Sequence, residues 1–312
     1  MENTILGLHH ITAIAGDAKQ NFNFYSKILG LRFIKKTVNF DDPGTYHFYF
    51  GDEVGSAGTI LTFFPWGAEI QQGRKGSGMA TEIGYSVPKG SLDFWQKRFE
   101  QYNVTYSKPT EKFGEKYLSF EDPDGLKLEL IESKTNDNRK GWETDEVKAD
   151  VATKGFHNVT LTLKDIKPTA AILTEIFGYK LIDQEANRYR YATATVENAA
   201  IVDLVELADE KHGHVANGTV HHVAFRVKND EILMHFREKV EAYGLSITPQ
   251  IDRQYFHSLY FREPGGVLFE IATDNPGFTV DEPLEELGKN LKLPAQYEAH
   301  RKTIENHLVK IN

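Results

Sequence analysis

The chain of 312 residues contains no cysteine, so it can form neither a disulfide bond nor a thiolate metal site. Any transition metal would have to be held by histidine and carboxylate side chains. No stretch approaches the ~18 consecutive apolar residues of a membrane-spanning helix, and the N-terminus lacks the basic and apolar regions of a signal peptide. These absences argue against a membrane protein, and we expect a cytoplasmic location.

Basic residues are also scarce, with 36 Lys and Arg against 45 Asp and Glu and a formal net charge of −9. This balance argues against a nucleic acid or an anionic membrane as a partner. A hydrophobic fraction of 40% is ordinary for a soluble globular protein, and the length suits about two domains. The sequence leaves open whether the chain forms a homo-oligomer.

The chain contains an internal repeat, which residues 8–37 and 156–185 show most clearly. These stretches align without a gap, with Thr12 on Thr160. Each copy reads as an apolar strand, a loop with aspartate, and an amphipathic helix that a glycine ends. A further strand follows directly, and two more strand-like segments complete each copy. The repeated unit is therefore β-α-β-β-β.

Two more divergent units follow the same plan, at residues 81–132 and 219–273. Their ends superpose without a gap, which places Glu129 on Glu270. Their helices are expected at Leu92–Tyr102 and Asp230–Tyr243. The predicted organisation has an N-terminal domain of two units (1–135), a polar linker (136–150), a C-terminal domain of two units (151–275) and a helical tail (276–312). Within the tail, helices are expected around Leu284–Leu293 and near Tyr297–Val309.

Paired units of this kind resemble the vicinal oxygen chelate fold, an α+β fold in which β-α-β-β-β units form cups of antiparallel strands. The resemblance implies that inward-facing residues on the first and last strands of each unit meet at the centre of a cup. Aligning H-H-I-T-A with H-H-V-A-F pairs His10 with His222, and Glu270 lies on the last strand of the fourth unit. The third and second units place Asn158 and Glu82 at the histidine position. Without an imidazole, that half is interpreted as a structural counterpart.

His10, His222 and Glu270 form a set of two imidazoles and one carboxylate, which can hold non-haem Fe(II) and leave coordination positions open. The same donors suit Mn(II), Zn(II) or Ni(II), so the set alone does not name the metal. Because it draws on the first and fourth units, these two should share one cup. A competing assignment replaces His10 with His157. We favour His10, because the ungapped alignment pairs His157 with His9, whose side chain points to the opposite face of the strand from that of His10.

Short motifs along nearly the whole chain carry a more specific resemblance. They are Leu8–Thr12, Gly58–Pro65, Gly73–Ser77, Val87–Leu92, Gly155–His157, Asn187–Tyr191, His221–Phe225 and Pro264–Glu270. Together they resemble the ring-cleaving dioxygenases of the glyoxalase/bleomycin-resistance superfamily, in the branch that opens para-hydroquinones. The resemblance implies an enzyme that uses Fe(II), or alternatively Mn(II), to insert O2 into a small aromatic diol. It further implies a role in quinone and hydroquinone detoxification or in aromatic degradation.

The same resemblance implies roles for individual residues around an Fe(II) site formed by the two histidines and the glutamate. Tyr260 would hydrogen-bond a substrate hydroxyl, and Arg253 would stabilise an anionic substrate or product. Thr12, two residues after His10 in the same expected strand, is a candidate for substrate binding. His9, Tyr260 and His257 are the candidates for the base that takes the substrate proton, and the sequence does not choose among them.

Three other functions stay open at the level of sequence. They are a catechol extradiol dioxygenase, a glyoxalase-type metal isomerase, and a non-enzymatic resistance protein that sequesters an aromatic ligand. The His-His-Glu set argues against the last of these, because sequestration needs no metal. Four other histidines are interpreted as having no role at the site: His47, His212, His214 and His235.

Overall fold

Each of the four units folds as a strand, a helical segment and three further strands, and the computed structural model describes residues 3–311. The first unit comprises β1 (Leu8–Ala15), α1 (Ala18–Asn23), β2 (Arg32–Val38), β3 (Tyr46–Gly51) and β4 (Ile60–Pro65). The second comprises β5 (Met79–Val87), α2 (Leu92–Gln101), β6 (Thr110–Lys112), β7 (Glu115–Glu121) and β8 (Lys127–Glu132).

The third unit comprises β9 (Phe156–Leu163), α3 (Lys167–Ala171), β10 (Lys180–Glu185), β11 (Arg188–Ala192) and β12 (Ile201–Glu206). The fourth comprises β13 (Thr219–Val227), α4 (Asp230–Ala242), β14 (Ile251–Asp252), β15 (Phe256–Arg262) and β16 (Leu268–Pro276). In the first and third units the helix continues as a π-helical turn, at Phe24–Ile28 and Ile172–Ile176. Within the four units the predicted β-α-β-β-β order is confirmed, and only the short strands β6 and β14 had no range assigned from the sequence.

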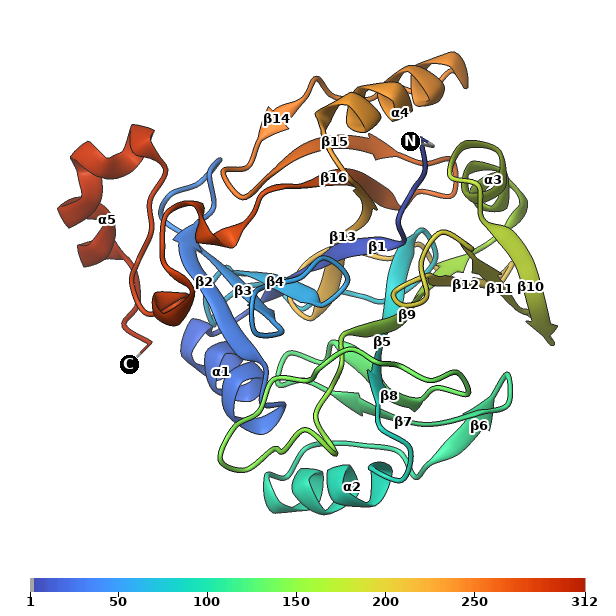
Figure 1. Ribbon diagram of the computed structural model, residues 1–312, viewed down its shortest axis with the longest axis horizontal. Helices are drawn as coiled ribbons and strands as arrows, with labels where there is room; N and C mark the ends of the chain where they lie inside the picture. The colour runs from blue at the N-terminus through green and yellow to red at the C-terminus, as the bar shows by residue number, and fades with distance from the viewer. Residues whose placement is uncertain (1–2, 312) are drawn as a thin grey trace.

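The strands form two curved sheets, each built from both halves of the chain (Figure 1). One sheet has the order β14-β15-β16-β13-β1-β4-β3-β2 and joins the fourth unit to the first. The other has the order β10-β11-β12-β9-β5-β8-β7-β6 and joins the third unit to the second. The expectation that the first and fourth units share one cup is confirmed. The division of the chain into domains at residues 136–150 stays a prediction.

The sheets are mixed, because the first and last strands of every unit lie side by side in parallel. In β1 and β4 Thr12 lies opposite Thr62, and in β13 and β16 Ala224 lies opposite Glu270. The helical segment carries the chain back to the end of the sheet at which the first strand begins, so the second strand runs in the same direction as the first. Two hairpins later the fourth strand runs in that direction again. All other neighbouring pairs are antiparallel, as expected for this fold.

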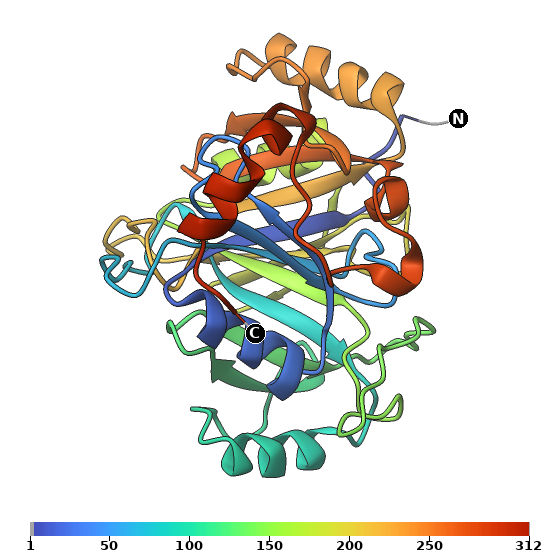
Figure 2. The same ribbon diagram turned by 90° about the vertical axis from the view of Figure 1, so that its left-hand side faces the viewer.

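The central strands and the helices bury a continuous apolar core. β1 and β9 are buried along their whole length, which explains why both read as apolar runs in the sequence. Asn229 caps the N-terminus of helix α4, because its side chain accepts a hydrogen bond from the backbone N–H of Ile232. The buried residues of α4 recur at helical spacing, so one face of this helix packs on β15 and β16. The helix α2 lies at the opposite end of the molecule (Figures 1 and 2).

The C-terminal tail is less helical than the sequence pattern predicts. The helix expected over Leu284–Leu293 is limited to a 3-10 turn at Leu284–Glu286. Gly288 has a φ of +78°, and a Cβ there would lie 2.1 Å from the carbonyl oxygen of Phe33. The chain therefore leaves the helical conformation where it packs on the first unit. The second expected helix is present as a 3-10 segment, Ala295–His300, followed by α5, Arg301–His307.

Polar contacts fasten this tail to the first unit. The ammonium group of Lys35 is fully buried and lies 2.6 Å from Asp281 and 2.7 Å from Glu282. The hydroxyl of Tyr297 donates a hydrogen bond of 2.7 Å to the carbonyl of Phe40, in the loop between β2 and β3. The tail therefore holds that loop in place.

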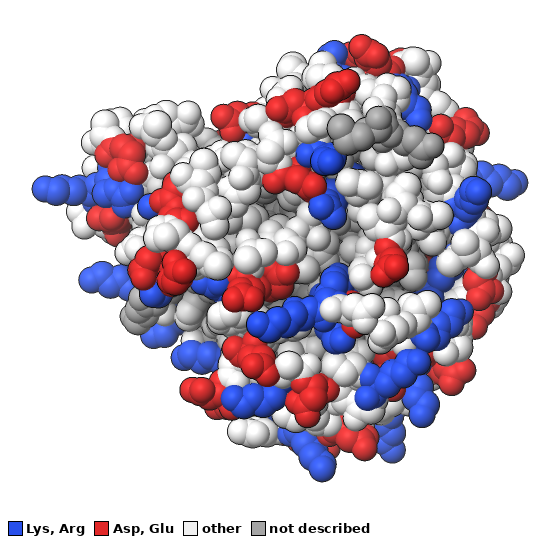
Figure 3. Space-filling view, in the orientation of Figure 1, with Lys and Arg blue, Asp and Glu red and all other residues white. Residues whose placement is uncertain are grey.

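Basic and acidic side chains are interspersed on the face shown in Figure 3 rather than gathered into a patch of one sign. Within the described residues, no helix is both long and apolar enough to cross a membrane.

Candidate metal centre

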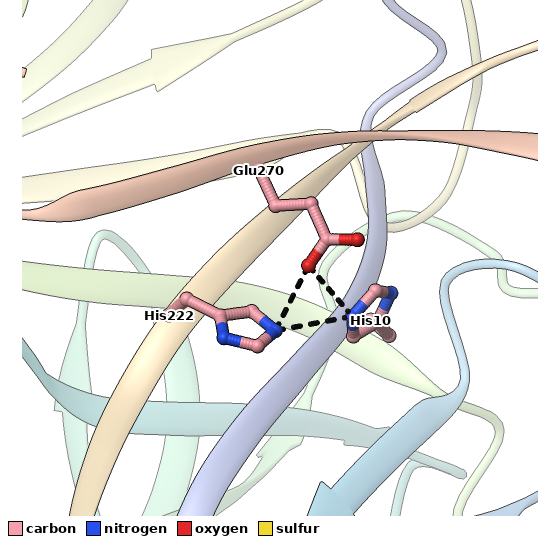
Figure 4. A group of neighbouring side chains, drawn as sticks. All are labelled: His10, His222 and Glu270. Atoms are coloured by element: carbon pink, nitrogen blue, oxygen red, sulfur yellow. Dashed lines mark hydrogen bonds and ion pairs between the residues drawn. The ribbon is translucent and has the colours of Figure 1, made fainter. Parts of the chain in front are cut away.

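Three side chains from adjacent strands converge at the centre of the first sheet (Figure 4). The Oε2 atom of Glu270 lies 3.2 Å from Nε2 of His10 and 2.9 Å from Nε2 of His222. The two Nε2 atoms are 3.3 Å apart, and all three residues are buried. Within residues 3–311, this is the only group of three or more histidine and acidic side chains whose ligand atoms lie within 4.8 Å of one another.

The strand register explains the convergence. β1 and β13 are antiparallel neighbours, with His10 opposite Ala224 and Thr12 opposite His222. Residues two apart in a strand share a face, so both imidazoles point to the same side of the sheet. Glu270 on β16 also lies opposite Ala224, which places the carboxylate in the same row as His10. The small methyl group of Ala224 stands between them and leaves the space that the larger side chains fill.

The electrostatics of the cluster suit a cation. Burial raises the pKa of Glu270, but the adjacent His10 and His222 hold it well below its usual range. Burial lowers the pKa of His222, which favours a neutral imidazole with a free lone pair. Ser258 donates a hydrogen bond to Oε1 of Glu270, whereas the buried Oε2 accepts no well-aligned hydrogen bond from any residue that the structure describes. Two imidazole nitrogens and one carboxylate oxygen aimed at a common point are donors that divalent transition metals accept.

A second imidazole orients each histidine of the cluster. Nδ1 of His9 lies 2.9 Å from Nδ1 of His10, and Nδ1 of His221 lies 2.8 Å from Nδ1 of His222. Burial and the adjacent histidine lower the pKa of His9 and of His221 to about 3, so both are neutral. With Nδ1 occupied in this way, Nε2 of each inner imidazole is fixed toward the centre. Nε2 of His9 is in turn 3.1 Å from the carbonyl oxygen of Thr273.

A cavity of about 190 Å³ opens beside the cluster. It is lined by His10, Asn39, Phe40, Asp41, His47, Tyr49, Phe64, Trp66, His221, His222, Arg253, Phe256 and Tyr260. Pockets for drug-sized ligands usually measure ~300–1,000 Å³, so this cavity suits a smaller molecule such as a single substituted ring. Phe40, Phe64, Trp66 and Phe256 give the cavity its apolar wall, and Tyr49, Tyr260 and Arg253 add polar groups to it.

Arg253 and Tyr260 form a charged part of the cavity wall. Nε of Arg253 donates a hydrogen bond of 3.2 Å to the hydroxyl oxygen of Tyr260, whose ring lies 5.7 Å from that of His222. Burial and the charge of Glu270 raise the pKa of Tyr260, so the phenol stays protonated. The guanidinium also lies 3.3 Å from Asp41 at the mouth of the cavity. This wall offers a positive charge and an O–H donor to a bound anion.

The remaining candidates from the sequence lie outside the cavity lining. Thr12 is fully buried and shares a hydrogen bond of 2.8 Å with Thr62. His257 lines a neighbouring groove, where its Nδ1 lies 2.6 Å from Asp230. His9 is buried behind His10. The roles in substrate binding and proton transfer that the sequence suggested for these three stay predictions.

His157, the competing ligand, lies in the other sheet. Its Nε2 is 2.9 Å from Glu115, and Arg190 lies 2.6 Å from the same carboxylate. It is therefore paired within the second sheet and takes no part in the cluster with His222 and Glu270.

His47 is a cavity residue that the sequence interpretation missed. It lines the cavity together with Tyr49, and their side chains share a hydrogen bond of 2.9 Å. Both lie on β3, a polar and aromatic strand whose register the alignment of first and last strands did not fix. The signal for them is the equivalence of β3 and β15 in the repeated unit, which only the hydrogen-bond register reveals.

Fixed charges fill the equivalent place in the second sheet. Asn158, Glu82 and Glu129 stand where the first sheet has His10, His222 and Glu270. The ammonium group of Lys112 contacts the carboxylate of Glu129 and lies 4.0 Å from Glu82. The surrounding network balances four basic with four acidic groups: Lys112, Lys127, Arg188 and Arg190 with Glu82, Glu115, Glu129 and Asp203. A side-chain cation thus neutralises the carboxylate here.

Comparison with known proteins adds independent information. The model of the Glyoxalase/Bleomycin resistance protein/Dioxygenase superfamily matches residues 7–130 and 155–271. The chain is 46% identical to MhqO of Bacillus subtilis, named as a ring-cleaving dioxygenase, over 99% of this chain and 97% of that protein. It is 38% identical to the chlorohydroquinone/hydroquinone 1,2-dioxygenase of Sphingobium indicum, over 94% of this chain and 92% of that protein.

Solved structures agree with the sequence matches. The crystal structure of a Bacillus subtilis protein described as a dioxygenase superposes with a TM-score of 0.93 at 45% identity, covering 99% of this chain and 98% of that one. Glyoxalase I from Zea mays superposes with a TM-score of 0.65 at 14% identity, covering 91% of this chain and 97% of that one. The second likeness concerns the fold alone.

Proposed function

Since the chain belongs to the Glyoxalase/Bleomycin resistance protein/Dioxygenase superfamily, we propose that it is an Fe(II)-dependent ring-cleaving dioxygenase acting on hydroquinone-type diols. The observation that carries the proposal is the convergence of His10, His222 and Glu270 beside a cavity of single-ring size. The names of the relatives support the substrate class. Such an activity would remove hydroquinones in the cytoplasm, in detoxification or in aromatic degradation.

The three clustered side chains would hold the metal and leave the cavity side free. The donors are two imidazole nitrogens and one carboxylate oxygen, a set that also accepts Mn(II). When bound, Fe(II) would supply Lewis acidity toward a substrate hydroxyl and a path for electrons between the ring and O2. His9 and His221 keep the ligand imidazoles oriented through their Nδ1 contacts.

Arg253 and Tyr260 would hold the ionised hydroxyl of the diol. Because the Tyr260 oxygen accepts a hydrogen bond from Nε of Arg253, its own proton is free to be donated to the substrate oxygen. The guanidinium charge lowers the cost of an anion in a buried cavity. The apolar walls contributed by Phe40, Phe64 and Phe256 would exclude water and pack against the ring.

Oxygen consumption tests this function directly. Protein loaded with Fe(II) under anaerobic conditions is expected to consume about one O2 per hydroquinone, because a dioxygenase inserts both oxygen atoms into one product. An oxygen electrode measures the uptake, and a parallel series with catechol separates para-diol from ortho-diol cleavage. Absence of uptake with every hydroquinone and catechol would favour the isomerase or the sequestering protein instead.

Removing the Tyr260 hydroxyl is expected to slow turnover. A hydrogen bond to a charged group contributes ~1.5–3 kcal/mol, so Tyr260→Phe should lower kcat/KM roughly 10- to 100-fold. The matched control is Ser119→Ala, because Ser119 lies opposite Glu129 in the second sheet as Tyr260 lies opposite Glu270 in the first. The control should turn over like the wild type. Equal losses in the two variants would argue against a single functional cup.

A further inference from the structure

Tyr49 occupies in the first unit the place that Tyr260 occupies in the fourth. Tyr49 lies opposite Thr62 on β4, as Tyr260 lies opposite Glu270 on β16. Thr62 in turn lies opposite Thr12, two residues after His10. Glu270 lies opposite Ala224, two residues after His222. The strands β3 and β15 stand at matching places on either side of the central pair of β1 and β13. Both tyrosines line the same cavity, each from a wall on its own side of the central pair.

His47 fixes the hydroxyl of Tyr49 through a chain of side-chain hydrogen bonds. Nδ1 of His47 is 2.9 Å from the Tyr49 oxygen, and Nε2 is 2.9 Å from Oγ1 of Thr62. Oγ1 of Thr62 is in turn 2.8 Å from Oγ1 of Thr12. Both ring nitrogens of His47 are thus engaged, so the imidazole holds the tyrosine rather than a ligand. Tyr49 itself is only 1% exposed, so its position is set by these contacts and by packing.

The Tyr49 oxygen keeps a free hydrogen-bonding position. Across residues 3–311, His47 is the only hydrogen-bond partner of that hydroxyl. If Tyr49 donates to Nδ1, a lone pair stays free, and if it accepts from Nδ1–H, its own proton stays free. In either arrangement it can bind a hydroxyl group, which is both donor and acceptor.

The two walls differ in charge. Tyr260 has the cationic Arg253 as its partner, whereas Tyr49 has an imidazole. Burial and the neighbouring His10 and His222 keep the pKa of His47 well below its usual range, so this imidazole is neutral. An anionic oxygen is therefore stabilised on the Arg253 side, and a protonated hydroxyl is the better partner on the Tyr49 side.

Resting on the proposed function, we propose that Tyr49 binds the second, protonated hydroxyl of the diol and that His47 positions Tyr49 for this contact. The ring would then lie between the two tyrosines, with its ionised oxygen toward Arg253. Hydroxyls at opposite ends of a ring, as in a hydroquinone, fit two walls that lie on either side of the central pair. Tyr49 and His47 would thus make the cavity selective for a ring that carries a second hydroxyl.

The test compares hydroquinone with 4-methylphenol, in which a methyl group of similar size replaces the second hydroxyl. Both are titrated by calorimetry into Fe(II)-loaded protein without O2, using the wild type and Tyr49→Phe. The variant should raise the Kd of hydroquinone about fivefold, the loss of one net hydrogen bond, and leave that of 4-methylphenol unchanged. Equal weakening of both ligands, or no weakening for hydroquinone, would overturn the proposal.

Variants of His47 separate positioning from a general effect on the fold. His47→Phe should reproduce the hydroxyl-specific loss, and combining it with Tyr49→Phe should add little, because both remove one contact. His47→Gln keeps donor and acceptor groups and should retain most of the discrimination. Additive losses that are the same for both ligands would show a merely structural role.

A control variant and a parallel assay keep the outcomes distinct. Tyr179→Phe removes a buried hydroxyl that has no hydrogen-bond partner among residues 3–311, and this variant should bind both ligands like the wild type. Oxygen uptake by the wild type with hydroquinone is measured alongside. If the wild type turns over hydroquinone but Tyr49→Phe shows no discrimination, only the role of Tyr49 fails. If the wild type binds neither ligand, that role and the proposed function fail together.

Discussion

Glu270→Gln is expected to abolish tight metal binding while leaving the fold intact. The substitution removes the only negative charge of the cluster and keeps the size of the side chain and its hydrogen bond with Ser258. Changing the outer contacts of a metal ligand typically costs 10–100-fold in affinity, so losing a ligand should cost more than ~100-fold. Metal analysis after anaerobic loading with Fe(II), together with circular dichroism, measures both parts of the expectation.

Two histidine variants complete this experiment. His10→Ala should lose the metal like Glu270→Gln, whereas His157→Ala makes the same change in the other sheet and should retain a full equivalent. A full equivalent of Fe(II) in both His10→Ala and Glu270→Gln would exclude the site. Loss of metal from His157→Ala alone would instead support the competing assignment.

The largest effect on stability is expected from Lys112→Met. Lys112 and Glu129 are both buried, and their side chains are in direct contact. Without the ammonium group, Glu129 is left as an uncompensated buried charge, which typically costs ~3–5 kcal/mol. Urea unfolding followed by circular dichroism should show this loss in the free energy of unfolding. Fe(II) binding by the folded variant should be unchanged, because His10, His222 and Glu270 lie in the other sheet.

The neighbouring Lys127 provides a matched control. Its side chain is 36% exposed and pairs with Glu82, which keeps a contact of 3.0 Å with Arg188 when Lys127 is replaced. Lys127→Met should therefore cost no more than ~1 kcal/mol. Replacing both Lys112 and Glu129 by apolar residues should recover most of the lost stability. Equal losses for the two lysine variants would contradict the proposed network.

Much of the architecture was predictable because two regularities constrain it: the alternation of side chains along a strand and the internal repeat of the β-α-β-β-β unit. Strand alternation assigns His10 and His222 to one face once the ungapped alignment gives their equivalence, and Glu270 follows from the last strand of its unit. The pairing of the first unit with the fourth then follows from the need to bring these three residues together. The register observed in the sheets agrees with that alignment.

The second set of polar groups was not predictable in the same way. Loops of unequal length precede β3 and β15, so counting residues does not equate Tyr49 with Tyr260; hydrogen-bond register does. Lys112 lies on β6, a strand of three residues that leaves no periodic pattern. The role of His47 depends on which wall of the cavity its hairpin forms. A single histidine in a strand of polar and aromatic residues does not indicate that wall.

The separation of the clustered residues along the chain has a consequence for biosynthesis. During translation His10 leaves the ribosome among the first residues, whereas Glu270 follows only when most of the polypeptide has been made. The sheet that bears the site also needs the last unit before its central pair, β1 and β13, can form. A nascent chain therefore cannot hold an ion in the complete cluster. Under the proposed function, metal loading is therefore a step that follows synthesis of the fourth unit, and it depends on the ions available at that time.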